Sequence, residues 1–216
     1  MWDKLKEQLN IMKIEKKRLY LISNSDKFDS KEDFLDAIAS ALQGGVEIIQ
    51  LDEQLIPDKI VVELAHKIRI LCDEFGATLV INNRADIAQL CQADGIHLEQ
   101  NSITIDNARE LLGKNSIIGM SISNTQEAVD AFNDGADYLL METDLATLKD
   151  IDSQQSEDFY WICQNVEIPL FIKAEVTKDN INAYIQAGVQ RIAVENSLMY
   201  SKIPEETARK LLKFLP

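Results

Sequence analysis

Asp94-Gly95-Ile96-His97-Leu98-Glu99-Gln100 is the stretch that decides the fold of this chain. In it a short apolar run ends abruptly in polar side chains, and the same arrangement recurs at intervals along the sequence. Most of these runs are continuous rather than alternating in hydrophobicity, which is typical of parallel strands covered on both faces. The pattern therefore predicts a parallel sheet whose strand ends carry the functional residues.

Short apolar runs predict eight strands, at residues 18–22, 46–51, 78–82, 95–98, 117–121, 138–141, 169–173 and 191–195. Apolar residues at helical spacing predict helices at residues 31–42, 60–75, 84–91, 105–112, 125–133, 157–164, 178–187 and 204–215. Ser30, Asn124 and Thr177 are suited to begin three of these helices, because their side-chain oxygens can accept hydrogen bonds from free backbone N–H groups.

Eight strands that each precede a helix give the count of a closed (β/α)₈ TIM barrel. The alternative is an open doubly wound sheet, which requires a glycine-rich turn after its first strand. The turn here is Ser23-Asn24-Ser25-Asp26-Lys27, which contains no glycine. We therefore predict an α/β protein with one barrel domain over residues 18–216. An amphipathic helix over residues 1–17 is predicted to precede it, from the apolar spacing of Trp2, Leu5, Leu9 and Met12.

The composition excludes several classes of binding partner and of site. The 36 acidic and 22 basic residues give a net charge of −14, which repels nucleic acid and anionic membrane surfaces. Cys72, Cys91 and Cys163 are far apart and odd in number, so we expect reduced thiols rather than a disulfide or a metal site. The chain shows neither a membrane-spanning apolar run nor a signal peptide, and we expect a cytoplasmic protein.

The predicted strand ends hold the candidate binding residues, because TIM barrels carry their sites at this face. The neutral and basic candidates are Gln50, Asn82, Asn83, His97, Gln100, Ser121, Lys173 and Asn196. The acids there are Asp52, Glu53, Glu99, Glu142, Glu175 and Glu195. These acids could bind a metal or an amine, although solvated loop ends are the more common reading.

His97 and Lys173 each allow two interpretations. His97 could be a catalytic base, but a buried, hydrogen-bonded structural histidine is favoured. Lys173 could form a Schiff base if it is desolvated. An ion pair with Glu142, Glu175 or Glu195 is favoured instead.

Seven segments, in this order, resemble the thiamine-phosphate synthase family and its relative TenI, a thiazole tautomerase. They are Leu19-Tyr20-Leu21-Ile22, Gly44-Gly45-Val46-Glu47-Ile48-Ile49-Gln50, Ile81-Asn82-Asn83-Arg84-Ala85-Asp86-Ile87-Ala88, Ala93-Asp94-Gly95-Ile96-His97-Leu98-Glu99-Gln100, Ile118-Gly119-Met120-Ser121-Ile122-Ser123-Asn124, Gly135-Ala136-Asp137-Tyr138 and Gln186-Ala187-Gly188-Val189. The resemblance covers residues 18–200 and implies a TIM barrel. It also implies a reaction that joins an aminopyrimidine pyrophosphate to a thiazole phosphate and releases pyrophosphate. Mg²⁺, Lys and Arg are expected to stabilise the departing anion.

The chain departs from the family pattern where phosphate and Mg²⁺ are bound. The family's Gln-x-Arg-x-Lys is here Gln50-Leu51-Asp52-Glu53-Gln54. The two positions expected to bind Mg²⁺ hold Asn83 and Ser102, so we expect no resident metal. The phosphate-cradling Ile-Gly-Gly-Ile is replaced by Lys173-Ala174-Glu175-Val176.

Three further positions differ from the family. The family's Gly-Pro-x-x-x-Thr-x-Thr-Lys loop aligns with residues 142–149, where Thr147 and Lys149 are the candidate remnants. Asn196 stands where the family has a phosphate-facing serine. Ser123 stands where TenI has its histidine.

Three functional hypotheses follow, and the first two assign no catalytic residue. The favoured one is a family member that has lost the Mg-pyrophosphate condensation and acts by binding a small ligand or by interaction. The second is an active thiamine-phosphate synthase with rearranged site residues. The third is a barrel enzyme of different specificity, in which the acidic rim binds a cation or an amine and Lys173 or Glu99 acts as the acid or base. The family resemblance also suggests a homodimer.

Overall fold

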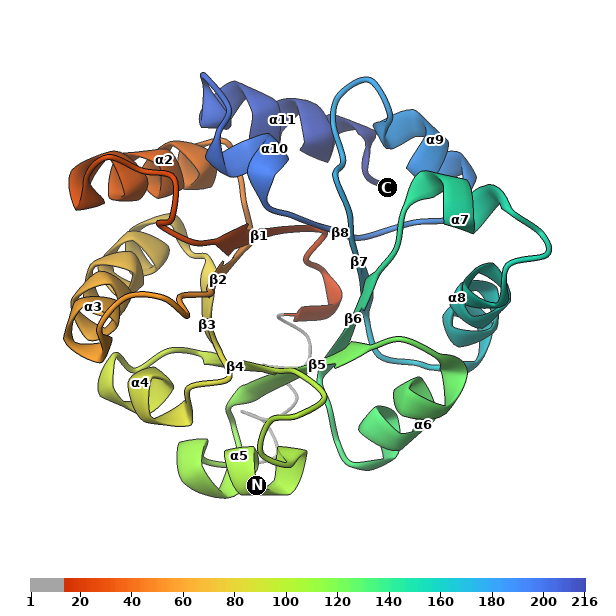
Figure 1. The fold of residues 1–216 in the computed structure, drawn as a ribbon, viewed down its shortest axis with the longest axis horizontal. Helices are drawn as coiled ribbons and strands as arrows, with labels where there is room; N and C mark the ends of the chain where they lie inside the picture. The colour runs from red at the N-terminus through yellow and green to blue at the C-terminus, as the bar shows by residue number, and fades with distance from the viewer. Residues whose placement is uncertain (1–13) are drawn as a thin grey trace.

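Residues 14–216 are described by the computed structural model, and they form a closed barrel (Figure 1). Eight parallel strands lie in sequence order, and β8 pairs with β1 to close the barrel. The strands are β1 (Leu19–Ser23), β2 (Ile48–Leu51), β3 (Thr78–Asn82), β4 (Gly95–Leu98), β5 (Ile117–Ile122), β6 (Tyr138–Glu142), β7 (Leu170–Lys173) and β8 (Ile192–Val194). The predicted TIM barrel is therefore confirmed.

Helices surround the barrel on its outside (Figure 1). They are α2 (Lys31–Gln43), α3 (Asp58–Phe75), α4 (Ala85–Leu90), α5 (Ile105–Leu112), α6 (Thr125–Asn133), α7 (Leu145–Lys149), α8 (Gln154–Asn165), α9 (Ile181–Gln186), α10 (Asn196–Met199) and α11 (Pro204–Phe214). Ser30 and Asn124 cap α2 and α6 as predicted. Within residues 14–216, no helix is both long and apolar enough to cross a membrane.

The helix pattern differs from the prediction in two respects. α7 and α10 were not predicted, since five and four residues are too few to show a helical period. The predicted start at Thr177 is wrong, because α9 begins at Ile181. There the Asn180 side chain accepts a hydrogen bond from the backbone N–H of Thr177, which forms a turn before the helix.

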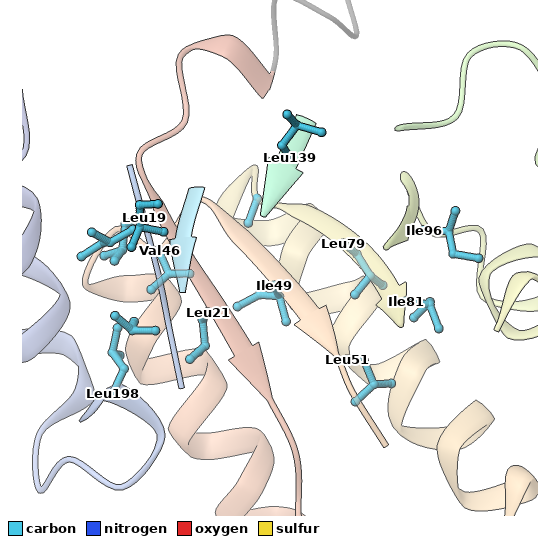
Figure 2. Packing of buried hydrophobic residues seen from close by; sticks show 14 of the residues in the cluster. Leu19, Leu21, Val46, Ile49, Leu51, Leu79, Ile81, Ile96, Leu139 and Leu198 are labelled. Atoms are coloured by element: carbon cyan, nitrogen blue, oxygen red, sulfur yellow. The ribbon is translucent and has the colours of Figure 1, made fainter. Parts of the chain in front are cut away.

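Each strand buries both of its faces, which explains the continuous apolar runs. Leu19 and Leu21 point outward into the layer between strands and helices, part of which Figure 2 shows. Tyr20 and Ile22, between and after them, belong to a separate cluster inside the barrel. There the rings of Tyr20, Tyr138 and Phe171 meet edge to face, with centroids 5.4 to 5.9 Å apart.

The segment before β1 contributes to this inner cluster through Ile14, which is fully buried. In Figure 1 this red segment is seen at the centre of the ring of strands. The predicted helix over residues 1–17 otherwise lies outside the described residues. Through Ile14, the segment before β1 helps to fill the interior of the barrel.

The contacts of Asp94 and Gly95 explain why these two residues begin the stretch 94–100. Asp94 Oδ2 accepts hydrogen bonds from the Leu79 N–H at 2.8 Å and from Arg69 Nη1 at 2.7 Å. A Cβ at Gly95 would lie 1.8 Å from the Ile117 carbonyl oxygen, so this position on β4 requires glycine. Asp94 thus ties β4 to β3, and Gly95 lets β5 approach closely.

Candidate functional site

Six polar side chains, one from each of β1 to β6, form a continuous hydrogen-bonded row across the barrel. We call this set the polar row; it comprises Tyr20, Gln50, Asn82, His97, Ser121 and Tyr138. All are buried except Ser121, which is partly exposed. The row brings together four of the predicted site residues, from strands far apart in the sequence.

One end of the polar row lies at the mouth of the barrel and terminates in carboxylates. Asn82 Nδ2 is 2.8 Å from Asp52 Oδ1 and 3.2 Å from Glu99 Oε1. Asn82 Oδ1 accepts a hydrogen bond from Gln50 Nε2 at 3.0 Å. Two acidic side chains therefore converge on the asparagine that ends β3.

The other part of the polar row runs through the aromatic interior. The Tyr20 hydroxyl lies 2.5 Å from Gln50 Oε1 and 2.9 Å from the Tyr138 hydroxyl. His97 Nδ1 is 3.1 Å from the Tyr138 hydroxyl, and His97 Nε2 is 2.9 Å from Ser121 Oγ. The row thus reaches from the two carboxylates to Ser121 without a break.

His97 is a structural histidine in this arrangement. Burial lowers the pKa of its imidazole to about 3, and the positive charge of Lys173 adds to the effect. The ring is neutral at neutral pH and both ring nitrogens are hydrogen-bonded. Its low pKa makes it a poor general base, and the structural interpretation of His97 is supported.

Gly119 makes the contact between His97 and Tyr138 possible. It pairs with His97 of β4 on one side and with Tyr138 of β6 on the other. Because Gly119 carries no side chain, the two rings can stack across it with centroids 5.7 Å apart. A Cβ on Gly119 would lie 2.0 Å from Tyr138 Cζ.

The substitution Gly119→Ala is expected to destabilise the protein by about 1–3 kcal/mol, because overpacking forces Tyr138 out of the row. Urea denaturation measures this loss. Ala128, buried on α6 away from the row, offers a control through Ala128→Gly, which changes a helix rather than Tyr138. Gly119→Ala should alter the near-ultraviolet signal of the buried tyrosines, whereas Ala128→Gly should not. An unchanged stability and signal in Gly119→Ala would contradict this account.

Lys173 is held in an ion pair and is therefore not a free nucleophile. Its Nζ lies 2.9 Å from Glu142 Oε2. Burial alone would lower the pKa of Lys173, but the hydrogen bond to Glu142 and nearby negative charges outweigh it and raise the pKa. The favoured ion pair is confirmed, with Glu142 as the partner. A Schiff-base role, which requires a neutral amine, is disfavoured.

The residues at the expected magnesium positions do not fit that ion. Asn83 Oδ1 accepts hydrogen bonds from the Ser102 hydroxyl and from the Glu99 N–H, the latter at 3.0 Å. Both side chains are neutral and bonded to each other, whereas Mg²⁺ is usually held through carboxylates. Residues 14–216 also contain no group of three or more His, Cys, Asp or Glu side chains placed to hold a metal ion.

The remaining predicted residues lie at the rim, outside the polar row. Asn196 Nδ2 donates to Glu175 Oε1 at 2.7 Å, and Asn196 Oδ1 accepts from Lys27 Nζ at 3.2 Å. The Gln100 side chain is exposed and reaches the Ser121 carbonyl oxygen at 3.5 Å. Thr147 lies on α7, where its N–H donates to the capping side chain of Asp144.

Sequence reasoning identified neither Tyr20 nor Tyr138 as part of the site. Both lie within apolar runs and give no strand-end signal. A usable signal was Gly119, since a glycine within a strand often marks a close approach by a neighbouring group.

Comparisons with known proteins agree with this architecture. The family model described as thiamine monophosphate synthase matches residues 19–198. A thiamine-phosphate synthase of Methanobrevibacter smithii is 30 % identical over 197 residues, covering 90 % of this chain and 93 % of the relative. One from a Nostoc species is 34 % identical over 204 residues, covering 94 % of this chain, which spans only 57 % of that relative's length.

The solved structure of thiamine phosphate pyrophosphorylase from Pyrococcus furiosus superposes with a TM-score of 0.80 and 27 % identity. The match covers 94 % of this chain and 96 % of that structure. Together with the match to the family model, this shows that the likeness extends through nearly the whole barrel. The chain belongs to the thiamine monophosphate synthase family.

Proposed function

We propose that this family member has lost the Mg-pyrophosphate condensation and binds an uncharged or positively charged small ligand at the mouth of its barrel. The observation that carries the proposal is the pair of carboxylates, Asp52 and Glu99, that converge on Asn82. A departing pyrophosphate requires cations at such a place.

Electrostatics disfavours pyrophosphate at this mouth. Two like charges ~4 Å apart repel by roughly 4 kcal/mol at an effective dielectric constant near 20. Binding with micromolar affinity supplies about 8 kcal/mol in total, so a few such contacts remove most of it. Lys173 offsets them only in part, because it is paired with Glu142 at 2.9 Å.

The replacement of the magnesium ligands supports the same proposal. Asn83 and Ser102 satisfy each other by hydrogen bonding, and neither adds negative charge that would attract a divalent cation. A diphosphate that cannot recruit Mg²⁺ keeps its full charge beside Asp52 and Glu99.

A second candidate, the active synthase, is favoured by one observation. Gln50 and Asn82, which match the family pattern, are retained and bonded to each other at 3.0 Å at the strand ends. These two residues of the family pattern are therefore still in place at the strand ends. A turnover measurement separates the two candidates.

The test is an assay of thiamine phosphate formation from the aminopyrimidine pyrophosphate and the thiazole phosphate with Mg²⁺. The Methanobrevibacter smithii relative, run in parallel, is the positive control. We expect turnover at least a thousandfold below that of the relative. Turnover within tenfold of the relative, lost on Gln50→Ala, would replace our proposal with the active synthase.

A further inference from the structure

The hydrogen atoms of the polar row can be assigned from its carboxylate end. Carboxylate oxygens only accept, so the amide nitrogen of Asn82 must face Asp52 and Glu99. Asn82 Oδ1 then faces Gln50 and accepts from its Nε2. The carbonyl oxygen of Gln50 is thereby turned toward the Tyr20 hydroxyl, 2.5 Å away, which must donate to it.

The assignment continues through the tyrosines, because each hydroxyl has a single hydrogen. Tyr20 has given its hydrogen to Gln50, so Tyr138 must donate to Tyr20. The Tyr138 oxygen can then only accept from His97, which requires a proton on Nδ1. A neutral His97 consequently has a bare Nε2 that accepts the hydrogen of the Ser121 hydroxyl.

Every hydrogen bond in the row therefore points the same way, from Ser121 toward Asp52 and Glu99. From this geometry we propose that Ser121 is the specificity-determining residue of the mouth, and that it presents only an oxygen acceptor to a ligand. His97, Tyr138 and Tyr20 are positioning residues that hold Ser121 in this state.

The ligand class follows from the acceptors that face the mouth. The hydrogen of Ser121 is committed to His97, so the Oγ of this partly exposed residue has only lone pairs left to offer. A ligand atom there must carry a hydrogen, as an ammonium, an amidinium or an amide N–H does. Carboxylate and phosphate oxygens would meet lone pairs and are excluded. This inference rests on the proposed function, since it describes the ligand of the same mouth.

The first test is the tautomer of His97, measured by long-range ¹H–¹⁵N correlation spectroscopy at pH 7. The chain has two histidines, so His66→Gln, which alters an exposed position on α3, leaves His97 as the sole imidazole. We expect the Nδ1–H tautomer in this background. The Nε2–H tautomer would overturn the proposal.

The second variant, Tyr20→Phe, tests whether the row sets the tautomer. Without the Tyr20 oxygen, His97 Nδ1 is the one remaining partner of the Tyr138 hydroxyl within residues 14–216, and it must lose its proton to accept. We expect His97 to change to the Nε2–H tautomer. Ser121→Ala, at the opposite end of the row, should retain Nδ1–H. Tyr20→Phe that keeps a native thermal transition and Nδ1–H would overturn the coupling.

The ligand class is tested with benzamidinium and benzoate, which have the same shape but opposite hydrogen-bonding character. Titration is followed by the ¹⁵N shifts of His97, whose Nε2 contacts Ser121. We expect benzamidinium to bind at least tenfold more tightly than benzoate, and Tyr20→Phe to reduce that ratio. Benzamidinium binding no tighter than benzoate would overturn the inference. The tautomer and binding measurements do not depend on turnover. If the proposed loss of the condensation reaction is wrong, the separate assay will show this by the formation of thiamine phosphate.

Discussion

Replacing Asp52 by arginine and Gln54 by lysine is expected to tighten the binding of inorganic pyrophosphate by about a hundredfold. The double variant restores the Gln-x-Arg-x-Lys pattern of the family at Gln50. It also changes the charge beside Asn82, where Asp52 now lies 2.8 Å from the amide nitrogen. Charges ~8 Å apart interact by about 2 kcal/mol at a dielectric constant near 20, and salt reduces this value. A total gain of about 2.7 kcal/mol corresponds to the expected factor of a hundred.

The matched control is Asp52→Asn, which removes the negative charge without adding a cation. It keeps an oxygen that can accept from Asn82 and should tighten pyrophosphate binding by less than tenfold. Isothermal titration calorimetry at two salt concentrations measures both variants, and the larger gain should shrink at high salt. Equal affinities in wild type and the double variant would mean that charge at this mouth does not limit anion binding.

Acidification is expected to lower the free energy of unfolding through His97. Burial holds the pKa of folded His97 at about 3. In the unfolded chain its pKa is about 6.5. Below pH 6.5 the unfolded state binds a proton that the folded state cannot, so stability falls as the pH falls. The slope is about 1.4 kcal/mol per pH unit, which amounts to about 3 kcal/mol between pH 7 and pH 4.

Comparison of two histidine variants isolates this effect from the carboxylates, which titrate in both. His97→Gln should lose this part of the pH dependence. His66→Gln should retain it, because His66 is exposed on α3. Urea denaturation at pH 7, 6, 5 and 4 gives the slopes. A His97→Gln protein with the same slope as wild type would show that the histidine is not buried in its neutral form.

Strands β3 and β4 were predictable to the residue because each is bounded on both sides by residues that cannot continue its apolar run. Thr78–Asn82 and Gly95–Leu98 coincide with the predicted ranges, since a continuous apolar run is enclosed by polar or glycine residues in each case. Helices α2, α5 and α6 were predictable from their apolar spacing and from caps such as Ser30 and Asn124. The short helix α7 was not, because its formation depends on the Asp144 cap more than on a repeating pattern.

The part of the candidate site at the strand ends could be predicted from the sequence, but the part inside the barrel could not. Gln50, Asn82 and His97 follow from the rule that strand ends carry the site, and the structure joins them. The link between them passes through Tyr20 and Tyr138, whose inward direction depends on the closure of the barrel. That closure brings β1 beside β8 and places Tyr20 within 2.9 Å of Tyr138, although 118 residues separate them. A contact between residues so far apart in the chain cannot be predicted from the local sequence around either of them.

The most direct measurement is a calorimetric titration of the wild-type protein with pyrophosphate in the presence of Mg²⁺. We expect no saturable heat at pyrophosphate concentrations up to the millimolar range, because Asp52 and Glu99 face the mouth and Lys173 is paired with Glu142. Saturable binding with a micromolar dissociation constant, abolished when Mg²⁺ is withheld, would contradict it.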